Sequence, residues 1–166
     1  MKKSSRNRTV SVHYLTTAAI IAALYVVFTG LSAAFGLASG VIQIRLSEAL
    51  TVLPYFTNAA VPGVTIGCLL ANLLTGAPLP DIIFGTLASF LGVLVASCLR
   101  KRKYLVALPT ILSNAIIIPL VLQYAYGVPD AFWYLFLTVG AGELISAGIL
   151  GTFLLQVLQK RKLFRK

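Results

Sequence analysis

The chain has 166 residues, of which 58% are hydrophobic and only 11% are charged, and its mean hydropathy is +0.92. Soluble domains carry roughly 25% charged residues, so this composition excludes an ordinary water-soluble domain and predicts a protein whose solvent is lipid. We expect residues 1–166 to form a single transmembrane domain.

The net charge of +10 comes from three basic clusters and one isolated arginine. The clusters lie within residues 2–8, 100–103 and 160–166, and the isolated residue is Arg45. Basic clusters beside apolar segments mark cytoplasmic loops and favour an anionic membrane leaflet. We therefore expect a lipid bilayer as partner rather than nucleic acid, with basic cytoplasmic ends at residues 1–11 and 160–166.

Four apolar segments supply the ~20 residues that a bilayer crossing needs. They run from about 12 to 31, 82 to 99, 104 to 126 and 131 to 158. The first apolar run is longer than the ~7–15-residue core of a signal peptide, so we expect an uncleaved first span.

The stretch at residues 46–75 contains Pro54 and Pro62, and it crosses either once or twice. Two crossings place all three basic clusters on one side, and TNAAVPG at residues 57–63 supplies a turn. The prediction is an all-α membrane protein with six transmembrane helices and both termini cytoplasmic. Its second helix, residues 46–56, spans only ~17 Å and needs shelter from its neighbours.

Most polar residues then gather at the outer face, below a Gly-, Ser- and Ala-rich loop at residues 32–44 that we expect to act as a flexible lid. Arg45 and Glu48 lie three residues apart and share a helix face. They either contact a ligand or form an ion pair at the lipid interface, with Arg45 snorkelling.

Glu143 is predicted near the middle of the membrane, where a charge costs roughly 2.5–3.5 kcal/mol. Such residues mark a ligand or ion path, and the alternative is a hydrogen-bonded Glu that holds helices together. Asn114 is predicted at a similar depth, within reach of a pairing with Glu143. Asp81 and Asp130 each follow a proline, a pattern typical of helix capping.

Other candidates have two readings each. Asn72 and Asn114 suit either helix–helix hydrogen bonds or ligand contact, and Trp133 and Tyr126 suit either stacking on a ligand or an interfacial aromatic belt. Small residues four apart allow close helix approach, with either an internal partner or another protein. The pairs in the first span are Ala18 with Ala22 and Ala19 with Ala23.

Catalytic motifs are missing from the sequence. It contains no GxxxxGK[ST] phosphate loop and no HExxH, and its single histidine, His13, is peripheral. Cys68 and Cys98 match no metal or redox spacing. We expect no enzyme activity, no metal site and no cofactor.

Three segments carry a family resemblance: IRLSEALTVLPYF at residues 44–56, GCLLANLLTG at 67–76 and LPDIIFGTLAS at 79–89. From about residue 16 to 155, the chain resembles the S components of energy-coupling factor (ECF) transporters, and more narrowly the QueT family of queuosine-precursor transporters. The resemblance implies an S-component bundle in the bacterial plasma membrane that captures preQ1, 7-aminomethyl-7-deazaguanine. It also implies docking through the first helix on a transmembrane coupling subunit driven by two ATPase subunits.

The chemistry of that ligand indicates which kinds of side chain would bind each part of it. A guanine-like edge suits one carboxylate, and the aminomethyl cation suits a second carboxylate or an aromatic face. The candidate substrate-binding residues are therefore Glu48, Glu143, Arg45, Asn72, Asn114, Trp133 and Tyr126, and the candidate docking residues are Ala18, Ala19, Ala22 and Ala23. Two alternatives stay open: an S component for another vitamin or nucleobase, and a small structural or assembly membrane protein.

Overall fold

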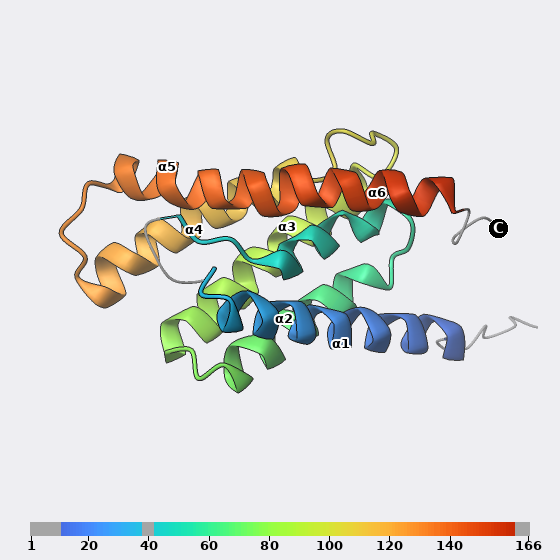
Figure 1. Ribbon diagram of the computed structural model, residues 1–166, viewed down its shortest axis with the longest axis horizontal. Coiled ribbons are helices and arrows are strands. Elements are labelled where there is room, and N and C mark those ends of the chain that lie inside the picture. The colour runs from blue at the N-terminus through green and yellow to red at the C-terminus, as the bar shows by residue number, and fades with distance from the viewer. Residues whose placement is uncertain (1–10, 38–41, 162–166) are drawn as a thin grey trace, which may run out of the picture.

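A computed structural model describes residues 11–37 and 42–161, and every regular element in these ranges is helical (Figure 1). The α-helices are α1 (Val12–Ala34), α2 (Ala60–Leu74), α3 (Thr86–Cys98), α4 (Leu108–Tyr126), α5 (Phe132–Glu143) and α6 (Gly151–Lys160). A 3-10 helix, η1 (Leu46–Tyr55), and two π-helical turns, η2 (Asp81–Gly85) and η3 (Leu144–Leu150), complete the set. Helices satisfy their own backbone groups in lipid, and the predicted all-α class is confirmed.

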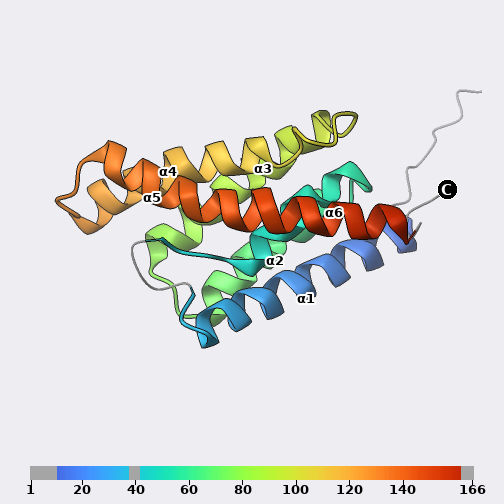
Figure 2. The ribbon, with the colours of Figure 1, turned by 45° about the horizontal axis from the view of Figure 1, so that its top comes forward.

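Four of these helical stretches are long and apolar enough to cross a membrane, counted over the described residues. They are Val12–Ala34, Asp81–Cys98, Leu108–Tyr126 and Phe132–Lys160. The last combines α5, η3 and α6, which form one continuous rod in both ribbon views (Figures 1 and 2). The two predicted crossings within residues 46–75 correspond to shorter helices, η1 and α2, so the count of six crossings stays a prediction.

The lipid-facing surface is apolar. On α1 alone, large exposed side chains include Leu15, Ile20, Leu24, Val27 and Leu31. In water this surface would favour aggregation, whereas hydrocarbon solvates it without penalty.

The short second segment lies at the centre of the bundle. η1 contacts α1, α2, α3, η3 and α6, and its residues 47–54 are all buried. As a 3-10 helix it rises ~2.0 Å per residue, so its ten residues span ~20 Å rather than the ~17 Å predicted for an α-helix. The predicted shelter from neighbouring helices is present.

Close packing joins α1 to α2 through glycine. A Cβ atom at Gly63 would lie 2.8 Å from the carbonyl oxygen of Ala18, and one at Gly67 would lie 3.0 Å from the Cα of Ala22. Ala18 and Ala22 are therefore buried against α2. Of the two partners left open for these alanines, the internal one is present, and contact of this pair with a separate subunit stays a prediction.

The other alanine pair faces outward. Ala19 and Ala23 are exposed on a neighbouring face of α1, and their role in docking stays a prediction.

Hydrogen bonds link the segments at one end of the bundle. Near the start of α1, the Tyr14 hydroxyl donates to the carbonyl oxygen of Asn58, and the Arg100 guanidinium donates to the Asn58 side chain. Near the end of α6, Gln159 donates to the Tyr55 hydroxyl. Figure 1 shows the start of α1, the loop after α3 and the end of α6 at this same end. The arrangement agrees with two passes through residues 46–75. The predicted terminal segments outside 11–161 and residues 38–41 of the predicted lid lie outside the described residues.

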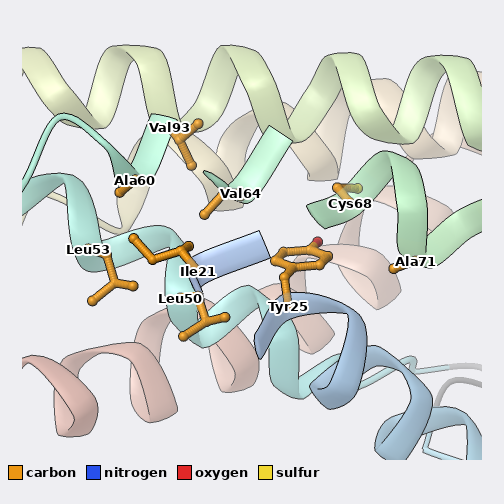
Figure 3. Close-up of a cluster of buried hydrophobic side chains, with 9 residues drawn as sticks. All are labelled: Ile21, Tyr25, Leu50, Leu53, Ala60, Val64, Cys68, Ala71 and Val93. Carbon is orange, nitrogen blue, oxygen red and sulfur yellow. The ribbon is translucent and has the colours of Figure 1, made fainter. Parts of the chain in front are cut away.

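A cluster of buried apolar side chains joins α1, η1, α2 and α3 (Figure 3). It consists of Ile21, Tyr25, Leu50, Leu53, Ala60, Val64, Cys68, Ala71 and Val93. Burial of Cys68 here agrees with an inert thiol. The cluster fixes η1 against α1 and thereby positions the polar residues at the start of η1.

Candidate functional site

A cavity of about 340 Å³ lies between η2, α3, α4, α5 and the extended segment before η1. Along α4 its lining residues recur four apart, at Asn114, Ile118 and Leu122, so one face of that helix forms a wall. The remaining lining residues are Gln43, Arg45, Asp81, Gly85, Ser89, Val128, Asp130, Tyr134, Leu135, Thr138, Val139 and Glu143. The volume falls at the small end of the ~300–1,000 Å³ range of ligand pockets.

Three predicted site residues meet at the inner end of this cavity: Glu143, Arg45 and Asn114. Glu143 is only 9% exposed, and its Oε2 has no hydrogen-bond partner among the described residues. Its carboxylate interacts with the Asn114 amide and with the Arg45 charge. Because an unpartnered buried carboxylate oxygen is costly, this atom is the strongest sign of a missing ligand donor.

The backbone around Arg45 is anchored from two sides. Its N–H donates to Ser146 Oγ over 3.1 Å, and the next N–H, of Leu46, donates to Ser32 Oγ over 2.8 Å. A Cβ atom at Gly142 would overlap the Gln43 carbonyl oxygen, so α5 needs glycine there. This close approach brings the segment carrying Arg45 against the residue that precedes Glu143.

Both π-helical turns border the site. Asp81 and Gly85 begin and end η2, and Glu143 directly precedes η3. π-bulges in helices occur frequently at functional sites.

Glu48 lies outside the cavity. It is 1% exposed, and the Tyr25 hydroxyl donates to its Oε1, while Oε2 has no partner among the described residues. It interacts electrostatically with Arg45. Glu48 is missing from the cavity lining because α1 packs over η1 and covers it, and its part in substrate binding stays a prediction. Among the described residues, the side-chain hydrogen bond of Glu48 is the one that Tyr25 donates.

Asn72 is also absent from the lining. Its Nδ2 donates to the carbonyl oxygen of Asp81 over 3.3 Å and approaches Cys68 Sγ at 3.7 Å. Of the two roles left open for Asn72, this geometry matches the helix–helix hydrogen bond. It anchors the first turn of η2, and thus the backbone of Asp81.

The two aromatic candidates do not line the cavity. Trp133 is 71% exposed and packs edge-on against Phe132 and Phe136, with ring centroids 5.4 and 5.9 Å apart. Tyr126 lies beside Asp81 without lining the cavity. The aromatic residue that does line it is Tyr134.

Asp81 and Asp130 were predicted to be acids that cap helix starts; Asp81 does lie in the first turn of η2, whereas Asp130 lies outside the first turn of α5. The N-cap of α5 is Ala131, one residue after Asp130, and neither α5 nor η2 has a side-chain cap hydrogen bond. Both aspartates instead line the cavity. The sequence feature that could have indicated this role is the placement of the two aspartates. Both Pro-Asp pairs begin predicted spans on the same side of the membrane.

Comparisons with known proteins agree with the sequence resemblance. A family model described as QueT transporter matches residues 15–160. The Queuosine precursor transporter QueT of Lactococcus lactis subsp. cremoris (strain MG1363) is 38% identical over 85 residues, an alignment that spans 49% of this chain and 50% of that relative. No solved structure matches significantly. Since the family model matches most of the chain, which carries several apolar helices, this multi-pass protein of the bacterial plasma membrane belongs to the QueT transporter family.

Proposed function

We propose that this protein is the substrate-binding S component of an ECF transporter and that it captures preQ1, 7-aminomethyl-7-deazaguanine. Membership of a transporter family and the name of the curated relative, a queuosine precursor transporter, support the ligand class. Family membership also favours transport over the alternative of a structural membrane protein.

The observation that carries the proposal is the unpartnered Oε2 of Glu143 in a cavity of about 340 Å³. A 7-deazaguanine edge offers two adjacent N–H donors, which one carboxylate accepts together. The neighbouring Asn114 amide and Arg45 guanidinium can donate to the ring carbonyl. Among flat bases, a guanine-like edge therefore meets all three groups with complementary partners.

We further propose that the end bearing the basic loops faces the cytoplasm, which places the cavity on the outer side. Docking then uses the exposed Ala19 and Ala23 face of α1, where small side chains let a helix of the coupling subunit approach closely. Two ATPase subunits supply the energy for release inside.

Thermal unfolding of the purified protein with candidate ligands tests the binding function. A ligand present at 100 times its Kd stabilises the folded state by about 2.7 kcal/mol, so preQ1 should raise the unfolding temperature measurably. Riboflavin, thiamine and guanine form the comparison panel. A larger rise with one of these would indicate another S component, and no rise with any ligand would favour the structural protein.

The matched control is Glu143→Gln, which keeps the side-chain shape and removes the charge. Loss of a charged partner in a buried hydrogen bond costs ~2–5 kcal/mol, or roughly thirty-fold or more in affinity. If this variant bound preQ1 as tightly as the native protein, the cavity would not be the substrate site.

A further inference from the structure

The polar lining of the cavity is concentrated at its inner end. The Ser113 hydroxyl donates to the Ala88 carbonyl oxygen over 2.9 Å. The residues that follow these two in the chain, Asn114 and Ser89, therefore lie within ~3 Å of each other in depth. Both line the cavity, as does Glu143, which interacts with the Asn114 amide.

The extended segment before η1 reaches the same depth. Its Gln43 carbonyl oxygen meets Gly142, the residue before Glu143, and Gln43 and Arg45 both line the cavity. The name "inner level" is used for the polar residues at this depth, which are Gln43, Arg45, Ser89, Asn114 and Glu143.

The next depth, toward the start of α5, is apolar apart from one hydroxyl. α4 and α5 lie side by side (Figure 1), and about one helical turn beyond the inner level they contribute Ile118 and Val139 to the lining. Thr138, beside Val139, lines the cavity at this depth and is half-buried. It precedes Glu143 by five residues, or ~7.5 Å along α5. A base held at the inner level would therefore extend between two apolar walls toward one hydroxyl.

The Thr138 hydroxyl is available to the cavity as a hydrogen-bond acceptor. It donates its proton to the Leu135 carbonyl oxygen over 3.1 Å. A hydroxyl oxygen that donates still carries acceptor lone pairs, and hydrogen bonds in a chain polarise one another, which makes this oxygen a better acceptor. The group therefore suits a ligand donor such as an ammonium and offers no hydrogen bond to a methyl group.

The distance from the inner level to Thr138 matches the length of the proposed ligand. In 7-aminomethyl-7-deazaguanine the amine nitrogen lies ~5–7 Å from the N–H donors of the base edge, given covalent bonds of ~1.3–1.5 Å. With that edge on Glu143, the amine reaches the depth of Thr138. The remaining polar lining residues lie farther from the inner level along their helices, and they are Asp81 at ~12 Å, Tyr134 at ~13.5 Å and Asp130 at ~20 Å.

We infer that the Thr138 hydroxyl accepts a hydrogen bond from the ammonium of the ligand and thereby sets the preference for an aminomethyl group, while the inner level holds the edge of the base. This inference rests on the proposed function and adds to it a specificity-determining residue. Because Thr138 is half-buried, the ammonium, a strongly hydrated group, keeps part of its water at this depth.

Binding of two ligands by purified variants tests the role of Thr138. The probes are 7-aminomethyl-7-deazaguanine and 7-methyl-7-deazaguanine, which differ by the amine alone. Thr138→Val keeps the shape and removes the oxygen, so it should weaken the aminomethyl ligand at least ~10-fold, the effect of losing a hydrogen bond to a charged group. It should bind the methyl ligand within ~3-fold of native, and Thr138→Ser, which keeps the oxygen, should bind both ligands within ~3-fold.

The matched control is Thr65→Val on α2. The Thr65 hydroxyl makes the same kind of bond, to the Val61 carbonyl oxygen over 2.8 Å, and Thr65 does not line the cavity. This variant should bind both ligands as the native protein does, and unfolding temperatures without ligand show whether each variant is folded.

Two results overturn the inference while the proposed function stands: Thr138→Val weakens both ligands equally, or it keeps the native preference for the amine. Equal affinity of the native protein for the two probes would also overturn it, because the amine would then have no partner. Failure of the native protein to bind either probe would instead refute the proposed function, and the role of Thr138 with it.

Discussion

Replacing Tyr25 with Phe tests the buried contact that links α1 to η1. The Tyr25 hydroxyl donates to Glu48 Oε1, and both residues are 1% exposed. Because Oε2 already lacks a partner among the described residues, Tyr25→Phe leaves the Glu48 carboxylate without a side-chain donor.

Hydrogen bonds to charged groups contribute about 1.5–3 kcal/mol. For a chain of this size, 1 kcal/mol corresponds to ~2–4 °C in unfolding temperature, so we expect a decrease of ~3–12 °C. The matched control is Tyr14→Phe on the same helix, whose hydroxyl makes only an exposed 3.4 Å bond to a carbonyl oxygen. Unfolding in detergent, followed by circular dichroism, measures both variants.

A second background separates the hydrogen bond from general packing. In Glu48→Gln, loss of the Tyr25 hydroxyl leaves a neutral amide rather than a carboxylate, so Tyr25→Phe should cost less there. Equal effects of Tyr25→Phe in both backgrounds, or an effect no larger than that of Tyr14→Phe, would refute the reasoning.

Three further predictions concern topology, packing and docking. In a protein lacking its native cysteines, an impermeant thiol reagent applied to cells should label Val128→Cys and leave Arg102→Cys unmodified; labelling at 102 would reverse the proposed orientation. Gly67→Ala should destabilise the fold by ~1–3 kcal/mol, since its Cβ would lie 2.7 Å from that of Tyr25, whereas Gly30→Ala has nothing within 4 Å and should be neutral or slightly stabilising in thermal unfolding. Ala19→Trp should abolish uptake in cells while ligand binding by the purified protein persists, and unchanged uptake would place docking elsewhere.

Local sequence patterns sufficed for the class of protein and for the depth of its polar residues. Uninterrupted apolar runs require helices in lipid, and the fixed rise of an α-helix placed Asn114 and Glu143 at similar depths. The structure brings these two residues together beside one cavity. Counting two passes through residues 46–75 also predicted the common end of the start of α1, the loop after α3 and the end of α6 that the structure shows.

Long-range packing decided what those patterns left open. The pairs Ala18/Ala22 and Ala19/Ala23 have identical spacing, and only the position of Gly63 and Gly67 across from α1 shows which pair is internal.

Local patterns were equally insufficient to place the acidic side chains. Spacing along one helix places Glu48 near Arg45, but the packing of α1 over η1 removes Glu48 from the cavity. Local Pro-Asp patterns indicate caps at Asp81 and Asp130, whereas the packing of α3, α4 and α5 brings both to the cavity wall. Sequence periodicity specifies which residues share a face of one helix, and the choice of the helix that each face meets depends on contacts between distant segments.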